Sequence, residues 1–341
     1  MAAPHSWPVA LETSVAVVVP SQSQNRSVAP QAVAEAVAAL HGNVERAILG
    51  KPGVVRLAIA CLLAEGHLLV EDVPGVGKTS LARALAASLD LTWRRIQFTP
   101  DLLPSDVTGV TIYNQGSSHF DFHEGPVFAN LVLADEINRA SPKTQSALLE
   151  VMEERRVTVD GAPHPVPRPF MVVATQNPVE MDGTYPLPEA QLDRFLMRVE
   201  IGYPDHDAEV GIVRTQGRGS AVDELRPVLS AADVAAMGKA ATEVFVAPSV
   251  EEYFVRVVAA TRTAAGVRLG ASPRATLALL RATRAWALTA GRGFVTPTDV
   301  QDLAVPVLAH RLLLTADAEL AGRTAASVVQ DVVRSVPAPQ P

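Results

Sequence analysis

Short apolar runs alternate along the first part of the chain with stretches whose apolar side chains share one helical face. The runs His67–Val70 and Leu131–Ala134 have the composition of strands that are buried on both faces of a parallel sheet. Downstream of the first run, Leu81, Leu85 and Leu89 recur at helical spacing. The pattern therefore predicts strands that are followed by helices.

Two hairpins and a series of helix starts extend this pattern. Val157–Val159 leads into Asp160-Gly161, a turn pair typical of tight hairpins, and a second short hairpin is expected between Gly109 and Phe128. Each helix start combines a capping hydroxyl with a nearby acid or a first-turn proline. These starts are Ser141-Pro142, Ser230 with Asp233, Ser249 with Glu252, Ser272-Pro273, and Thr296-Pro297 with Asp299. The last four predict a small helical bundle.

Composition shifts divide the chain into segments. Residues 1–30 contain four prolines and one short apolar run, so we expect a disordered tail there and another at 336–341. Glycines and a proline within 205–229 predict a linker between a core at 31–204 and a helical lid at 230–335.

Cysteine content and charge bear on compartment and partners. The chain has a single cysteine, no recognisable secretory signal and no apolar run that is long enough for a membrane span, so a cytoplasmic location without membrane insertion is expected. The net charge of -7 argues against a protein that tracks nucleic acid. The basic pairs Arg94-Arg95 and Arg155-Arg156 are isolated from each other in the sequence. We expect them to be solvated or to face a pore, and not to form a basic stripe that binds nucleic acid.

Residues 71–79, EDVPGVGKT, follow the first apolar run and open a helix, which is the arrangement of a phosphate-binding loop. Gly75 and Gly77 allow backbone N–H groups to approach an anion closely. Lys78 would reach the β and γ phosphates, and Thr79 would place its hydroxyl on Mg²⁺. Asp72 stands where the usual pattern has its first glycine. A plain Pro-Gly turn would explain the glycines but not the strand and the helix beside them, so we predict that the chain binds a nucleoside triphosphate.

Two acids follow the second apolar run. Asp135 and Glu136 would lie at the C-terminal end of a strand, where parallel sheets bind ligands. Asp135 would help to hold Mg²⁺, and Glu136 would orient and deprotonate the water that attacks the γ phosphate. Solvated acids at a strand end are the alternative, which the upstream phosphate loop disfavours.

Two further side chains are candidates for the same chemistry. Asn177 ends the run Phe170–Thr175 and would lie beside Glu136 in neighbouring strands, although an asparagine before proline is also ordinary turn chemistry. Arg194 precedes an alternating strand and could stabilise charge on a nucleotide held by a neighbouring subunit. An ion pair with Asp193 or a nearby acid is the alternative for Arg194.

Several segments together resemble the MoxR group of AAA+ ATPases. The resemblance rests on residues 69–79, 97–106, 135–140, 174–178 and 189–195, and resumes at 272–275, 291–292, 295–300 and 310–311. It spans roughly residues 31–315. It implies an α/β P-loop core with a parallel central sheet, followed by a small all-α lid. It also implies assembly into homo-oligomeric rings, usually of six subunits, with ATP and Mg²⁺ at each junction.

The resemblance also assigns roles to single residues. Gly75, Val76, Gly77, Lys78, Thr79 and Ser80 match Walker A, Asp135 and Glu136 match Walker B, Asn177 matches sensor 1, and Arg194 is similar to an arginine finger. Arg274 matches sensor 2. Spacing leaves open whether it contacts the nucleotide of its own subunit or that of a neighbouring subunit. An ion pair with an acid on a neighbouring helix is the alternative. Gln97 resembles a polar switch that restrains the catalytic glutamate. Ile48 and Gly50 resemble the segment around adenine, or form a plain junction between helix and loop.

The resemblance implies ATP hydrolysis coupled to remodelling, activation or cofactor loading of a client protein. A partner with a von Willebrand factor A domain is also implied. A chelatase-type or nucleic-acid-associated motor and an ATP-dependent scaffold with little turnover are the alternatives. Glu136 and Arg194 speak against the scaffold. His119 and His123 lie four residues apart in the first hairpin, where solvent exposure is favoured over a zinc site because no third ligand joins them.

Overall fold

The computed structural model describes residues 28–73, 75–116, 118–177, 183–216 and 221–340. Among these residues, five strands form a parallel central sheet in the order β10, β1, β9, β6, β3. Their bounds are β10 (Met197–Val199), β1 (Leu68–Glu71), β9 (Met171–Gln176), β6 (Leu131–Asp135) and β3 (Trp93–Gln97). The C-terminal ends of β1, β9 and β6 therefore lie side by side at one edge of the sheet.

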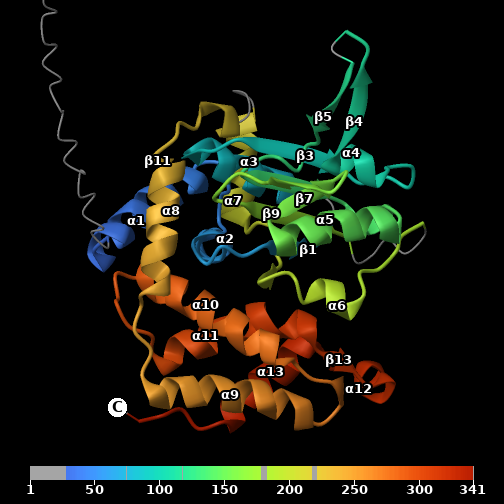
Figure 1. Ribbon diagram of the computed structural model, residues 1–341. Helices are drawn as coiled ribbons and strands as arrows, with labels where there is room; N and C mark the ends of the chain where they lie inside the picture. The colour runs from blue at the N-terminus through green and yellow to red at the C-terminus, as the bar shows by residue number, and fades with distance from the viewer. Residues whose placement is uncertain (1–27, 74, 117, 178–182, 217–220, 341) are drawn as a thin grey trace, which may run out of the picture.

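Both faces of the sheet are buried, as the apolar runs predict. Leu68 and Val70 of β1 belong to one core and Leu69 belongs to the other. The first core includes α1 (Pro30–Glu45), α2 (Pro52–Leu63) and α3 (Lys78–Ser88), and the second includes α5 (Pro142–Glu154). The α/β class is thus confirmed, with helices on both faces of the sheet (Figure 1).

The last third of the chain, residues 231–335, is mainly helical and packs against α1 and α2 (Figure 1). Its helices are α8 (Ala231–Thr242), α9 (Pro248–Thr263), α10 (Pro273–Thr289), α11 (Pro297–Leu308), η3 (Ala309–Arg311), α12 (Ala316–Leu320) and α13 (Ala325–Ser335). The stretch that was expected to be a linker holds α7 (His206–Gln216) and η2 (Ala221–Glu224). The remaining elements are α4 (Pro104–Thr108), η1 (Ile137–Arg139), α6 (Glu189–Leu192), the parallel pair β2 (Leu89–Asp90) and β11 (Leu229–Ser230), and the antiparallel pair β12 (Val267–Leu269) and β13 (Leu313–Leu314).

The two predicted hairpins are present and are fastened to each other. They consist of β4 (Gly109–Asn114) with β5 (His119–Glu124), and of β7 (Arg156–Val159) with β8 (Ala162–Pro165). The Thr111 hydroxyl donates to Asp160 Oδ2 at 2.7 Å, and the rings of Phe122 and His164 lie 4.3 Å apart. β4 and β5 project from the body of the protein (Figure 1).

Most of the predicted helix starts are correct. The hydroxyls of Ser141, Ser230 and Thr296 each accept an N–H from three residues on, and Ser272 occupies the N-cap of α10. The start at Ser249 is wrong, because α9 begins at Pro248 with Ala247 as its N-cap. A proline has the backbone angle of a first helical residue, so the helix begins at Pro248, two positions earlier than predicted.

Residues 1–27 of the predicted tail lie outside the described residues, and 337–340 hold no helix or strand. Among the helices that the structure describes, none combines the length and the apolar character needed to cross a bilayer.

One buried histidine, directly before β1, contacts both β9 and α5. His67 accepts the backbone N–H of Val172 at Nδ1 over 3.0 Å, and its Nε2 lies 3.0 Å from the carbonyl of Met152, to which it donates. Burial and the charge of Arg155 lower the pKa of His67 from 6.5 to about 3. His67 is therefore neutral in the folded chain near neutral pH and at mildly acidic pH.

We expect the protein to lose stability as the pH falls from about 6.5 to 5. In this range the unfolded chain binds a proton at His67 that the folded chain does not, which costs about 1.4 kcal/mol per pH unit. Melting temperatures at pH 7, 6 and 5 test this for wild type and His67→Gln, which should show a shallower slope. His206→Gln, at an exposed position, is the control. Equal slopes for all three proteins would contradict the expectation.

Candidate nucleotide site and arginine face

The phosphate loop joins β1 to α3. Gly75 and Gly77 have φ of +85° and +96°, in the left-handed region that glycine adopts without strain. Lys78 opens α3, and its Nζ donates to the carbonyls of Asp72 at 2.6 Å and Gln176 at 3.3 Å. The lysine is thus held at the sheet edge between β1 and β9.

Asp72 has a structural task that a glycine could not perform. Its carboxylate accepts the backbone N–H groups of Gly202 at 2.6 Å and Val73 at 2.8 Å. Gly202 follows β10, so Asp72 fastens the start of the phosphate loop to the chain that leaves the edge strand. This contact accounts for the departure from the usual glycine pattern.

The two acids lie opposite the start of α3. Asp135 is 7% exposed and accepts hydrogen bonds from the hydroxyls of Thr79 at 3.3 Å and Thr175 at 2.6 Å. Glu136 has φ 57° and ψ 49°, a conformation that costs a non-glycine residue energy and that clusters at functional sites. Its N–H donates to Thr175 Oγ1 at 2.9 Å. Buried Thr175 therefore positions both acids, a role that the sequence analysis missed.

Gln97 and two arginines complete the surroundings of these acids. Gln97 Nε2 donates to Glu136 Oε2 at 2.9 Å, and Arg139 Nε lies 3.2 Å from the same oxygen. Arg95 Nη2 donates to Asp135 Oδ2 and to Gln97 Oε1, both at 2.7 Å. Arg95 is about half exposed to solvent, and it also pairs with Asp135, a contact that the sequence did not predict. Arg95 and Gln97 stand two apart on β3, so both side chains point to the face that holds the acids.

Two adjoining cavities follow the phosphate loop. One, of about 330 Å³, is lined by Gly75, Gly77, Lys78, Thr79, Ser80, Asp135, Glu136 and Asn177. The other, of about 470 Å³, shares Gly75, Gly77 and Ser80 with it and is also lined by Ile48, Leu49, Val76, Ile201 and Ile212, among others. The polar end suits phosphates, and the apolar end suits a base. Gly50 does not line this cavity and packs against α7, where a Cβ would meet Ala208 at 2.8 Å.

Arg194 and Arg274 lie elsewhere. Arg194 Nη2 is 3.1 Å from Glu153 Oε2, and Arg274 Nη2 is 2.6 Å from Glu153 Oε1. The hydrogen bond from Arg274 lowers the pKa of Glu153. In the single chain both arginines thus pair with an acid on a neighbouring helix, as the alternatives allowed.

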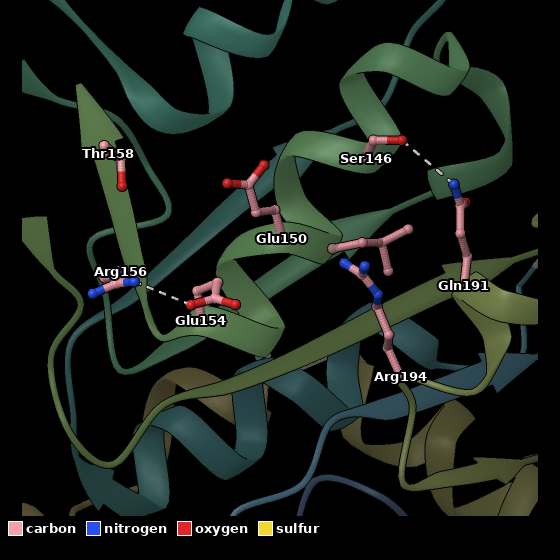
Figure 2. A pocket seen from close by; sticks show the side chains of 8 residues that line it. Ser146, Glu150, Glu154, Arg156, Thr158, Gln191 and Arg194 are labelled. Carbon is pink, nitrogen blue, oxygen red and sulfur yellow. Dashed lines mark hydrogen bonds and ion pairs between the residues drawn. The ribbon is translucent and has the colours of Figure 1, made fainter. Parts of the chain in front are cut away.

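Arg194 lines a third cavity, of about 530 Å³, beside α5 and β7. Figure 2 shows the Arg194 side chain directed toward α5, with the ion pair of Glu154 and Arg156 on the opposite side of the view. No residue that lines this cavity also lines the phosphate cavity. The structure therefore brings together Lys78, Asp135, Glu136 and Asn177, but not Arg194 or Arg274.

The oxygens of Thr79 and Asp135 are donors of the kind that Mg²⁺ prefers, so these two residues fit the metal of a nucleotide site. His119 and His123 lie on exposed β5. Within the described residues, no three His, Cys, Asp or Glu side chains are grouped as metal ligands would be.

The strand order, the phosphate loop after β1, the acids after β6 and the helical lid define a P-loop nucleotide-binding protein of the AAA+ class. The ATPase family associated with various cellular activities (AAA) matches residues 67–197, and the AAA lid domain matches 259–332. The uncharacterized protein YeaC of Bacillus subtilis (strain 168) is 48% identical over 87% of this chain and 93% of its own length. The chaperone MoxR1 of Mycobacterium tuberculosis is 45% identical over 87% of this chain and 81% of its own.

A solved structure from Cytophaga hutchinsonii, described as a candidate ATPase, superposes with a TM-score of 0.84 at 37% identity and covers 91% of this chain and 97% of its own. The chain belongs to the MoxR family of AAA+ ATPases.

Proposed function

We propose that this chain hydrolyses ATP at sites shared between neighbouring copies in a ring and couples hydrolysis to remodelling of a client protein. One observation carries the proposal. The residues suited to hold phosphates and activate water line one cavity, whereas Arg194 lines another and pairs with Glu153. A site divided in this way is complete when one copy presents the surface that bears Arg194, here called the arginine face, to the phosphate cavity of the next copy.

The roles follow from the geometry of the phosphate cavity. Lys78 and the N–H groups of the loop bind the β and γ phosphates of ATP. Glu136 accepts a proton from the attacking water, and Asn177, buried at the end of β9, orients that water or the γ phosphate. Thr79 and Asp135 would hold Mg²⁺, which neutralises phosphate charge when it is bound.

Arg194 of one copy would stabilise the charge that develops on the γ phosphate of its neighbour. Arg274 reaches the same carboxylate, Glu153, as Arg194 does. This shared partner supports a role for Arg274 toward the neighbouring nucleotide and not toward its own. The usual family number, six subunits, is the ring size that we propose.

The joined hairpins supply the surface for the client. Tyr113 and Phe120 face each other across β4 and β5 with ring centroids 5.1 Å apart, and they expose 49% and 72% of their surface. Exposed aromatic side chains on a projecting hairpin are suited to contact another polypeptide. The name chaperone, which is given to the relative from Mycobacterium tuberculosis, agrees with such a contact.

The rate of Mg²⁺-dependent ATP hydrolysis per subunit is expected to rise with protein concentration and then level off, since a shared site forms only on assembly. Lys78→Ala should weaken ATP binding about a hundredfold or more through the loss of charge-assisted contacts. Lys143→Ala, at an exposed position on α5, is the control and should behave as wild type. A per-subunit rate that is independent of concentration would contradict the proposal.

A further inference from the structure

The turn that bears Arg194 rests on a buried arginine of the lid. Arg311 of η3 is 8% exposed, and its guanidinium donates to Asp193 Oδ1 and to the carbonyl of Phe195, both at 2.7 Å. It also donates to the carbonyls of Asp193 and Leu196, each at 3.3 Å. These acceptors flank Arg194 on both sides.

The geometry of these contacts fixes the backbone of the turn. A guanidinium carries five N–H donors in a rigid fork, so several acceptors at set directions hold one arrangement. Without the fork, His310 Nε2, at 3.2 Å, would be the side-chain partner that the described residues leave to the buried carbonyl of Phe195. A lysine in place of Arg311 would supply one compact charge and could not reach the same acceptors together.

The same junction orders Arg274. Ser272, the N-cap of α10, donates its hydroxyl to Asp193 Oδ2 at 3.3 Å. One carboxylate oxygen of Asp193 therefore accepts a hydrogen bond from Arg311, and the other accepts one from Ser272 at the start of α10. Arg274 lies two residues after Ser272 and reaches Glu153 together with Arg194.

We propose that Arg311 is a positioning residue for Arg194, through which the lid sets the arginine face that one copy presents to the nucleotide of the next. The inference rests on the proposed function. It goes beyond that function by assigning the placement of Arg194 to a buried side chain of η3 that lines neither of the two cavities at the phosphate loop. Hydrolysis in one subunit thus depends on the lid of its neighbour.

The competing explanation is that Arg311 merely holds the lid to the core. A variant with a generally weakened lid would lose stability where α8 and α10 pack on α1 and α2, and would assemble poorly. A variant with a misplaced Arg194 keeps its phosphate cavity intact and fails only as a donor of the arginine. Mixed rings separate these two defects.

The experiment measures ATP affinity, assembly and ATPase rate of the full chain for Arg311→Met and Arg311→Lys, alone and mixed with Lys78→Ala. Arg292→Met is the matched control, because Arg292 also forms a two-bond pair with a buried lid acid, Asp299, at 2.5 and 2.8 Å. Arg194→Ala mixed with Lys78→Ala tests the shared site itself.

We expect Arg311→Met to bind ATP and assemble as wild type but to hydrolyse about a hundredfold more slowly, the effect of a misplaced catalytic group. Arg311→Lys should show the same defect in a milder form. In randomly mixed rings about one junction in four joins an intact phosphate site to an intact arginine face, so mixing should restore about a quarter of the wild-type rate. Arg292→Met should keep the wild-type rate per assembled subunit.

Three results would overturn the inference. Recovery in the Arg194→Ala mixture but not in either Arg311 mixture would leave the shared site standing and refute the role of Arg311. An Arg292→Met rate as low as that of Arg311→Met would assign the loss to a weakened lid. Failure of every mixture, with wild type active, would disprove the shared site, and the inference would fall with it.

Discussion

Replacing Arg194 with alanine is expected to lower the rate of ATP hydrolysis per assembled subunit by about 10³- to 10⁵-fold, the range attributed to arginine fingers. In its own chain Arg194 pairs with Glu153 and lines a cavity that shares no residue with the phosphate cavity. ATP affinity of the separated subunit should therefore stay unchanged. Equilibrium binding of a fluorescent ATP analogue measures the affinity. Sizing in ATP measures assembly, and steady-state kinetics give the ATPase rate.

Arg156→Ala is the matched control for this variant. Arg156 lines the same cavity and pairs with Glu154 at 3.3 Å, but it lies on β7 and not on the turn after α6. Its removal should change the rate little, as is usual for an exposed ion pair. Full activity in an Arg194→Ala protein that still assembles would point to a self-contained ATPase and would refute the shared site.

Replacing Glu136 with glutamine is expected to lower hydrolysis by about 10²- to 10⁴-fold, the contribution of a positioned general base. The amide has nearly the shape of the carboxylate but cannot take the proton of the attacking water. ATP binding should persist because Lys78 and the phosphate loop are untouched. Single-turnover hydrolysis and sizing in ATP should show loaded rings that do not turn over.

The same chemical change at Glu251, an exposed residue in the first turn of α9, provides the control and should leave the rate unchanged. Glu136→Gln with normal turnover would mean that another group activates the water. In that case the strained backbone of Glu136 would need a different explanation.

Local signals in the sequence predicted much of this fold. Some features depend on residues that are close together in the chain, so they can be predicted from the sequence alone. They include the phosphate loop, the apolar strands and the helix caps at Ser230 and Thr296. The hairpin at Asp160-Gly161 is of the same kind, since both residues adopt the positive φ that such turns require.

The contacts that could not be predicted join residues far apart in sequence. Thr175 and Arg95 each meet Asp135 across about forty positions, and these contacts appear only once β3, β6 and β9 are neighbours. A polar residue inside an apolar run was the signal for Thr175, and spacing of two from Gln97 was the signal for Arg95. The joint pairing of Arg194 and Arg274 with Glu153 depends likewise on how the lid, packed on α1 and α2, brings Arg274 to α5.

The bond between Thr111 and Asp160 and the stacking of Phe122 on His164 also constrain how this protein diverges. A substitution in one hairpin alters the partner that the other hairpin requires, so we expect the effects of substitutions in the two hairpins to be coupled. A chimera that takes β4 and β5 from a relative needs β7 and β8 from the same donor.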